Sequence, residues 1–304
     1  NICLPNTIVN EARLHIPRKG IFGSFRQSRP CGDSLFPRIL WTKSNSDLVI
    51  VPDLEYSICI THRKKEVAHT VTQKEQVIEA MRQNGGYATF GQLNGMLDFS
   101  SWKTRTPQAS VRRIVQVNRE FFKVSPGLWA LADRRNTVLS KFEIKDNDEK
   151  RKAEFSHSYF QGLLVEMGNF QGFDTYVPNQ DKNRRFLEKP LGSIATLKEI
   201  HAFTYPPILS KAKTVDVVWF NARKLPQAFF EVEHSTDIQN SLVKFYELQD
   251  FAARFCIVAP DYRKRQFDSV TQLSVFERIR SRVEFISYDD IAKEHEKRSM
   301  GRLF

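Results

Sequence analysis

The stretch Thr214-Val-Asp-Val-Val-Trp-Phe220, followed after a short turn by Gln227-Ala-Phe-Phe-Glu-Val-Glu-His234, decides the fold. Both runs are rich in Val, Phe and Trp, which favour β-strands, and residues 221–226 supply turn residues between them. An antiparallel hairpin centred within that turn places Asp216 directly opposite Glu231, because the two residues are equidistant from its centre. The sequence therefore predicts a hairpin with two facing carboxylates.

A third carboxylate belongs to the same face of this hairpin. Glu233 lies two residues after Glu231, and side chains two apart on a strand point the same way. Cross-strand neighbours have Cβ atoms about 4.5–5.5 Å apart, and carboxylates this close repel one another unless a cation lies among them. Oxygen ligands without a Cys or His cluster favour Mg²⁺ or Mn²⁺ over zinc. The alternative is a solvent-exposed acidic stripe, but strands that are apolar on both sides are usually buried.

These residues resemble the catalytic core of the restriction-endonuclease-like superfamily, the PD-(D/E)xK nucleases. Glu231-Val-Glu-His-Ser-Thr-Asp-Ile238 is similar to the pattern of a bacterial branch tied to restriction and genome defence. The resemblance covers about residues 153–291 and implies an α/β fold with an αβββαβ core. This chain has Glu233 where the family usually has Lys. Some members work with Glu there, and others take a cation from the following helix, where Lys244 lies.

The resemblance also implies roles for individual residues. Asp216 and Glu231 would hold Mg²⁺ or Mn²⁺, Glu233 would position the attacking water or add a ligand, and Lys244 would stabilise charge on the phosphate. The first helix of this fold often adds a carboxylate to the metal site, and Glu166 is the candidate. The alternative for Glu166 is an exposed acid at a helix end. Such enzymes usually act as homodimers on double-stranded DNA.

The flanking segments agree with that core. Apolar residues at helical spacing predict helices, and short apolar runs predict buried strands. A strand, a helix and a strand after an antiparallel hairpin is the order that the core requires. The predicted helices cover about 154–167, 237–254 and 266–282, and the further strands cover about 173–178, 255–260 and 284–287.

The middle of the chain predicts a second, smaller domain. Thr72 and Glu75 form the pattern of a capping box, and Thr106-Pro107 has the favoured arrangement of an N-cap followed by Pro. We expect helices at about 72–83, 89–97 and 106–116, then two strands around Ser125-Pro-Gly127. Three helices followed by a β-hairpin indicate a winged helix-turn-helix, an α+β DNA-binding domain.

Polar residues of this domain suit DNA. Gln108, Arg112 and Gln116 form an i,i+4 stripe on the third helix, and Arg and Gln read guanine and adenine edges in the major groove. Lys103 and Arg105 precede the helix, where they can contact phosphates. The alternative is a winged helix that binds protein and whose basic face is only solvated. The expected DNA contacts are Lys103, Arg105, Gln108, Ser110, Arg112, Arg113, Gln116 and Lys123.

The charge distribution supports DNA as the partner. The net charge of the 304 residues is +11. Lys and Arg outnumber Asp and Glu by 10 to 6 in residues 1–66 and by 10 to 5 in 67–136, against 26 to 24 in 137–304. A basic region joined to a nearly neutral one suggests polyanion capture in the first and chemistry in the second.

The sequence thus predicts four regions. A poorly defined basic region occupies 1–66, the winged helix-turn-helix domain 67–140, a charged linker 141–152 and the nuclease domain 153–304. The first residue is not Met, as in a processed protein or a fragment.

Cysteine spacing and hydropathy bear on the cellular compartment of the protein. The four cysteines lack the paired spacing of a zinc site, and no disulfide framework is evident. No apolar run reaches the roughly 18–20 residues of a membrane span, and no signal peptide is visible, so we expect a cytoplasmic protein with no membrane partner. The resemblance implies a bacterial one. The sequence is interpreted as a Mg²⁺-dependent (or Mn²⁺-dependent) DNA endonuclease of restriction or defence type. The alternative is a non-catalytic DNA-binding regulator that keeps the nuclease fold.

Overall fold

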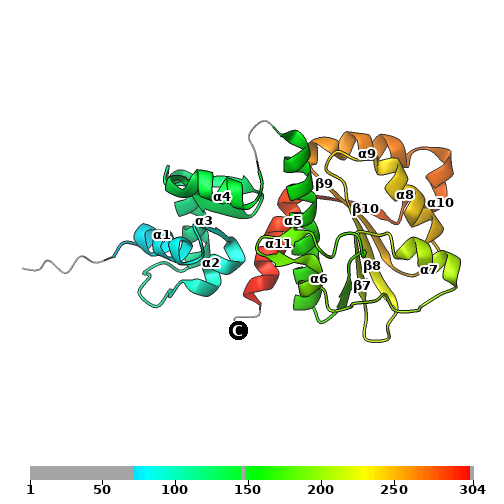
Figure 1. Ribbon diagram of the computed structural model, residues 1–304, viewed down its shortest axis with the longest axis horizontal. Coiled ribbons are helices and arrows are strands. Elements are labelled where there is room, and N and C mark those ends of the chain that lie inside the picture. Colours follow the sequence, from blue (N-terminus) through cyan, green and yellow to red (C-terminus); the bar gives the residue numbers. More distant parts are fainter. Residues whose placement is uncertain (1–70, 145–147, 302–304) are drawn as a thin grey trace, which may run out of the picture. The chain divides into compact units, whose positions relative to one another are not determined.

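The structure, a computed structural model, describes residues 71–144 and 148–301 (Figure 1). The basic region predicted for residues 1–66 lies outside the described residues. The described part is a mixed α/β chain.

A five-stranded mixed sheet forms its centre. The order is β10-β9-β8-β7-β4, in which β8, β9 and β10 are parallel while β4, β7 and β8 are antiparallel. Most residues of the three middle strands are buried, because Val, Ile, Phe and Ala fill both of their faces. The strands are β4 Asp174–Tyr176, β7 Val217–Phe220, β8 Pro226–Val232, β9 Arg254–Ala259 and β10 Val283–Ser287.

The hairpin of β7 and β8 has the predicted register. Val217 pairs with Phe230 and Trp219 with Ala228, and the register shifts between Trp219 and Phe220. One further residue along the same register places Asp216 opposite Glu231. Glu231 reaches Lys244 of α8, whereas Asp216, which precedes β7, has its Oδ1 toward His157 of α5.

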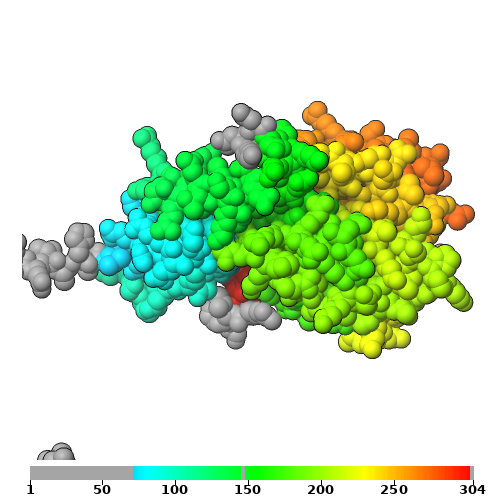
Figure 2. All heavy atoms as spheres, viewed as in Figure 1, coloured from blue at the N-terminus to red at the C-terminus, as the bar shows by residue number. Residues whose placement is uncertain are grey.

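Helices cover both faces of this sheet (Figure 1). On one face, Val217, Trp219 and Phe230 pack in a core with α5 Glu149–Phe170 and α11 Tyr288–Met300. On the other, Val218 and Phe229 pack against α8 Ile238–Glu247, α9 Lys264–Thr271 and α10 Glu277–Arg280. Figure 2 shows all heavy atoms in the same view, where the orange surface at the upper right belongs to the region of α9 and α10. The result is a three-layer arrangement around two apolar cores.

A smaller α+β part precedes this sheet. Its antiparallel strands have the order β1-β3-β2, and its own core includes Val77, Leu93 and Val111. The predicted capping box from Thr72 to Glu75 is present, and a second capping box runs from Thr89 to Gln92. Its elements are α1 Gln73–Gln83, β1 Tyr87–Thr89, α2 Phe90–Met96, α3 Pro107–Val117, β2 Phe121–Ser125 and β3 Leu128–Leu131.

Short elements complete the described chain. They are α4 Arg135–Lys141, β5 Arg185–Phe186, β6 Lys189–Pro190, α6 Leu191–Ile194 and α7 Pro206–Ala212. Within residues 71–144 and 148–301, no helix combines the length and the apolar composition that crossing a membrane requires.

Several predicted boundaries were wrong. Helix α5 begins at Glu149, inside the segment expected as a linker, because Asp148 caps it by accepting a hydrogen bond from the amide of Arg151. Helix α8 ends at Glu247, and the helix expected over 266–282 is divided into α9 and α10. Helix α11 was missed, although Ser287 caps it and acids follow in its first turn.

We predict opposite effects for alanine at two helical glycines. A Cβ at Gly162 of α5 would lie 2.1 Å from the ring of Phe186, whereas a Cβ at Gly95 of α2 meets no atom of residues 71–144 and 148–301 within 4 Å. Gly162→Ala should lower the free energy of unfolding by about 1–3 kcal/mol through overpacking. Gly95→Ala should raise it by about 0.5–1 kcal/mol, because alanine loses less backbone entropy. Denaturant unfolding measures both, and stabilisation by Gly162→Ala would contradict this packing.

Candidate active site

The three carboxylates of the hairpin lie together at one end of the central sheet. Asp216 stands immediately before β7, Glu231 lies in β8 and Glu233 directly follows that strand; all three are buried. The amide of Val232 donates a hydrogen bond to Asp216 Oδ2 at 2.7 Å, which ties the two strands together at this end. Asp216 is therefore tied to the strand that carries Glu231.

A lysine of α8 neutralises the central carboxylate. Lys244 Nζ lies 2.8 Å from Glu231 Oε2 and 2.9 Å from Oε1, and it also donates to the carbonyl of Thr214 at 3.1 Å. Burial alone would lower the pKa of Lys244, but the adjoining Glu231 raises it above its ordinary value. Lys244 therefore stays charged beside Glu231.

Burial makes the ionised acids costly. Burial raises the pKa of Asp216, although the nearby His157 opposes this effect. Burial, and next the charge of Asp216, raise the pKa of Glu231 well above its ordinary value. Asp216 and Glu231 are both buried, and ionisation of both is unfavourable. An added cation would reduce this free-energy cost.

Glu233 is held by the protein on several sides. Its carboxylate accepts hydrogen bonds from the hydroxyls of Ser241 and Thr236. Arg263 Nη1 lies 3.9 Å from Glu233 Oε2 and donates to the backbone carbonyl of Glu233 at 2.9 Å. Arg263 is itself buried, so it offsets the charge of Glu233 where water cannot.

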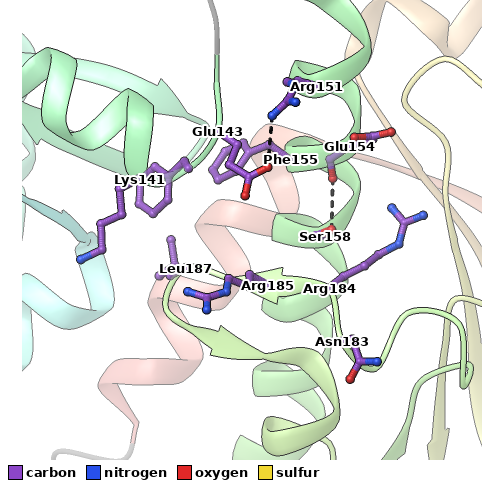
Figure 3. A pocket seen from close by; sticks show the side chains of 11 residues that line it. Lys141, Glu143, Arg151, Glu154, Phe155, Ser158, Asn183, Arg184, Arg185 and Leu187 are labelled. Atoms are coloured by element: carbon purple, nitrogen blue, oxygen red, sulfur yellow. Dashed lines mark hydrogen bonds and ion pairs between the residues drawn. The ribbon is translucent and has the colours of Figure 1, made fainter.

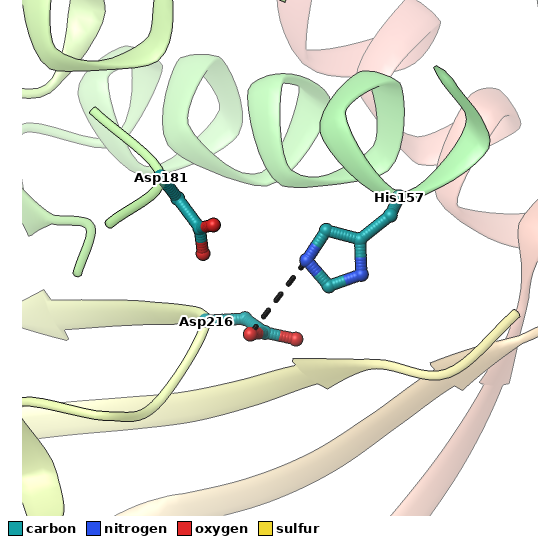
Figure 4. A group of neighbouring side chains, drawn as sticks. All are labelled: His157, Asp181 and Asp216. Carbon is teal, nitrogen blue, oxygen red and sulfur yellow. Dashed lines mark ion pairs between the residues drawn. The ribbon is translucent and has the colours of Figure 1, made fainter. Parts of the chain in front are cut away.

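A mixed cluster of His157, Asp181 and Asp216 adjoins the carboxylates (Figure 4). His157 comes from α5 and Asp181 from the loop between β4 and β5. One ligand atom from each residue lies within 4.8 Å of the other two, and within the described ranges this is the one such group of His, Cys, Asp and Glu. A divalent cation would find nitrogen and oxygen donors here.

Sequence reasoning missed two of these residues, His157 and Asp181. Neither follows a motif, and they lie 59 and 35 residues before Asp216 in the chain. A signal existed in the spacing of α5, where His157 and Gln161 are four residues apart and share a face. Gln161 Nε2 donates to Asp181 Oδ2 at 3.0 Å and to the carbonyl of Asp216 at 3.1 Å.

The expectation that Glu166 joins the metal site is not met by its position. Glu166 follows His157 by nine positions on α5, which is about two and a half turns. Its side chain therefore lies on the opposite side of the helix. Its carboxylate instead lies 2.7 Å from His295 Nε2 of α11. Glu166 therefore belongs to the contact between two helices.

One pocket adjoins the cluster, and another pocket shares lining residues with it. One, of about 580 Å³, is bordered by His157, Arg184, His234 and Tyr262 among others. The second, of about 440 Å³, shares Arg184 with the first (Figure 3). Its remaining basic side chains are Lys141, Arg151 and Arg185. A polyanion could reach the carboxylates along this side.

The residues expected to contact DNA divide into two groups. Arg112 Nη2 forms an ion pair with Glu296 of α11 at 2.7 Å, and Lys123 Nζ with Asp289 at 3.3 Å. In the second group, Lys103, Arg105, Arg113 and Gln116 are exposed, while Gln108 and Ser110 are half-buried. Helix α11 thus engages part of the predicted DNA surface.

The larger, C-terminal part of the chain is similar to a domain of a restriction enzyme. A family model described as the type II restriction enzyme NmeDI C-terminal domain matches residues 138–302. Type II restriction enzyme NmeDI of Neisseria meningitidis serogroup C is 29% identical over 126 residues, which are 38% of this chain and 35% of that protein. The chain thus spans about a third of the length of this curated relative. No solved structure matches.

We predict that Asp216→Asn stabilises the metal-free protein in a pH-dependent way. The folded pKa of Asp216 is raised, so ionisation costs folding free energy as the pH rises above the ordinary value of about 4. The amide is never ionised and keeps an oxygen for the amide of Val232. The variant should match the wild type near pH 4 and unfold at a higher temperature at neutral pH, measured with a chelator present. A difference that does not change with pH would contradict this assignment.

Proposed function

This chain belongs to the family of the type II restriction enzyme NmeDI C-terminal domain, and we propose that it is a metal-dependent DNA endonuclease of the restriction type. The order α5-β4-β7-β8-α8-β9 supports a PD-(D/E)xK core within residues 153–304. Likewise, α1, α2 and α3 followed by the β2–β3 hairpin support a winged helix-turn-helix domain over 67–140.

The observation that carries the proposal is the contact of Lys244 with Glu231 opposite Asp216. In the proposed enzyme, an acid before one strand, an acid in the next and a cation near both form the catalytic set. The structure has the Lys244 ammonium within 3 Å of Glu231 although it comes from α8. An amine from the following helix can thus occupy the place of the lysine that Glu233 replaces.

Each residue of the proposed centre would have its own role in hydrolysis. Asp216 and Glu231 would hold Mg²⁺ or Mn²⁺, which when bound polarises a phosphate and lowers the pKa of a bound water. Lys244 would place positive charge where the phosphate gains negative charge. Glu233, fixed by Ser241 and Arg263, would orient the attacking water from the same end of the sheet.

The basic pocket of Figure 3 would guide the DNA backbone toward these acids. Lys141, Arg151, Arg184 and Arg185 line it, and Arg184 Nε is 2.8 Å from Asp181 Oδ1. Arginine forms bidentate contacts with phosphate. A DNA strand along this pocket would also pass the pocket of about 580 Å³, which His157 borders.

In the proposed enzyme, α3 binds double-stranded DNA. Lys103, Arg105 and Arg113 are exposed and would contact phosphates first. Arg112 and Lys123 would exchange Glu296 and Asp289 for DNA. We further propose a homodimer that cuts both strands in the bacterial cytoplasm, and light scattering with and without DNA tests its size.

Cleavage assays test the proposed centre. We expect Mg²⁺-dependent or Mn²⁺-dependent cutting of plasmid or phage DNA, native or methylated. Asp216→Ala and Glu231→Ala should each abolish cutting while DNA affinity, measured by fluorescence anisotropy, stays nearly unchanged. Retained cutting in either variant would remove the site assignment. If the wild type cuts no DNA with either metal, the non-catalytic DNA-binding regulator replaces the enzyme.

Lys244→Met should isolate the role of the ammonium. The substitution keeps most of the apolar stem and deletes the charge, and cleavage should fall on the order of 10²-fold. Lys244→Arg should recover part of it, and the exposed Lys211→Met is the matched control. If Lys244→Met cuts normally while Glu233→Gln is inactive, Glu233 fills this role and Lys244 does not.

DNA affinity of the full chain tests α3. Lys103→Ala should weaken binding to all sequences alike and reduce the salt slope by about 1. Arg112→Ala should weaken sites selected from random DNA more than random DNA itself, while Glu296→Gln, which removes its partner's charge, should not weaken them. Lys211→Ala serves as the control. Equal losses for Lys103→Ala and Arg112→Ala on every sequence would make α3 a nonspecific clamp.

A further inference from the structure

His157 is oriented as a ligand. Its Nδ1 lies 3.0 Å from the carbonyl oxygen of Val232, an acceptor only, so Nδ1 carries the proton and donates. In the neutral ring, the lone pair is then on Nε2, which lies 3.7 Å from Asp216 Oδ1. Metal-bound histidines typically donate their second ring N–H to a carbonyl or carboxylate, which fixes the tautomer in this way.

The two carboxylates of the cluster have acceptor capacity left. Asp181 accepts from Arg184 at 2.8 Å and from Gln161 at 3.0 Å, and an ionised carboxylate offers about four acceptor positions. Asp216 accepts from Val232 through Oδ2, so Oδ1 faces His157. Arg184 offsets one of the two negative charges.

Gln161 supports two residues of the cluster from within the protein. The side chain is fully buried, and its Nε2 bridges Asp181 and the carbonyl of Asp216. Its Oε1 is buried and has no hydrogen-bond partner among the residues that the structure describes. A buried acceptor of this kind is costly unless a cation or an ordered water satisfies it.

An ion can reach the cluster from solvent. His157 borders the pocket of about 580 Å³, and its side chain is 22% exposed. Figure 4 shows the imidazole of His157 and the carboxylates of Asp181 and Asp216 converging from α5, a loop and the start of β7. An oriented histidine, carboxylates held by neighbouring side chains and access from solvent are the features expected of a metal site.

We propose that His157, Asp181 and Asp216 bind a divalent transition metal, with Mn²⁺ preferred to Mg²⁺, through His157 Nε2 and one oxygen of each carboxylate. An imidazole donor suits transition metals, whereas Mg²⁺ favours oxygen ligands and retains its waters. The site shares Asp216 with the proposed nuclease centre and extends it toward α5. The proposal concerns which atoms bind the metal, so metal-binding measurements test it without DNA cleavage.

Mn²⁺ binding to the full chain, measured by electron paramagnetic resonance, tests the proposal. Free Mn²⁺ gives a sharp signal that decreases on binding, and pulsed measurements detect coupling to an imidazole nitrogen. The wild type should bind Mn²⁺ with this coupling, and a tenfold excess of Mg²⁺ should not displace it. His157→Asn should abolish the coupling and lower the Mn²⁺ affinity on the order of 10-fold or more, with little change for Mg²⁺.

The substitutions are chosen so that folding does not confuse the result. The amide nitrogen of asparagine can still donate to the carbonyl of Val232, so His157→Asn keeps the contact between α5 and β8. His201→Asn is the matched control, because His201 is 20% exposed and also lies beside an aspartate, 3.1 Å from Asp174 Oδ2. It should leave both the nitrogen coupling and the affinity unchanged.

Several results would overturn the proposal. They are absence of Mn²⁺ binding by the wild type, absence of nitrogen coupling, coupling that persists in His157→Asn, and equal competition by Mg²⁺. The proposed nuclease can fail separately: Mn²⁺ bound through nitrogen without DNA cleavage leaves this site in place and removes the enzyme. DNA cleavage without nitrogen coupling would support the enzyme and remove this metal site.

Discussion

The burial of three like charges at one end of the sheet is the constraint on which the surrounding structure depends. Asp216, Glu231 and Glu233 are each less than a tenth exposed, and unpaired buried carboxylates would cost several kcal/mol each. Compensation therefore has to come from neighbouring elements. Helix α8 supplies Lys244, and the segment before α9 supplies Arg263. The elements that follow the hairpin are thus coupled to it by charge as well as by packing.

The same constraint explains which parts of the site were predictable. Asp216 and Glu231 belong to one hairpin, so strand alternation and turn length were enough to bring them together. Lys244 follows within one helix, and its reach could be inferred from the resemblance. His157 and Asp181 come from distant elements, and only the packing of α5 on the sheet places them there. Local pattern reasoning does not contain that information.

Glu166 shows the cost of a small error in helical phase. An isolated acid on α5 was chosen by residue type, but the surface of a helix rotates by about 100° for each residue. The face toward Asp216 carries His157 and Gln161, and Glu166 lies on the side of His295. The divided helix after β9 has a related cause, since its apolar residues suited helical spacing without revealing the break. Phase and breaks are set by tertiary contacts that periodicity alone does not specify.

The site keeps positive charge although Glu233 occupies the position where a lysine is expected. A lysine there would face Glu231 from the same strand; Glu233 instead interacts with Arg263, and Lys244 approaches Glu231 from α8. Both carboxylates therefore keep a cationic partner although the strand itself carries only acids. The positive charge has moved from a strand to a helix and a loop. Since those elements contact the sheet through their own apolar residues, the position of the ammonium near Glu231 depends on the packing of α8 through Leu242 and Phe245. The chemistry of this end of the sheet thus follows from how α8 packs on it.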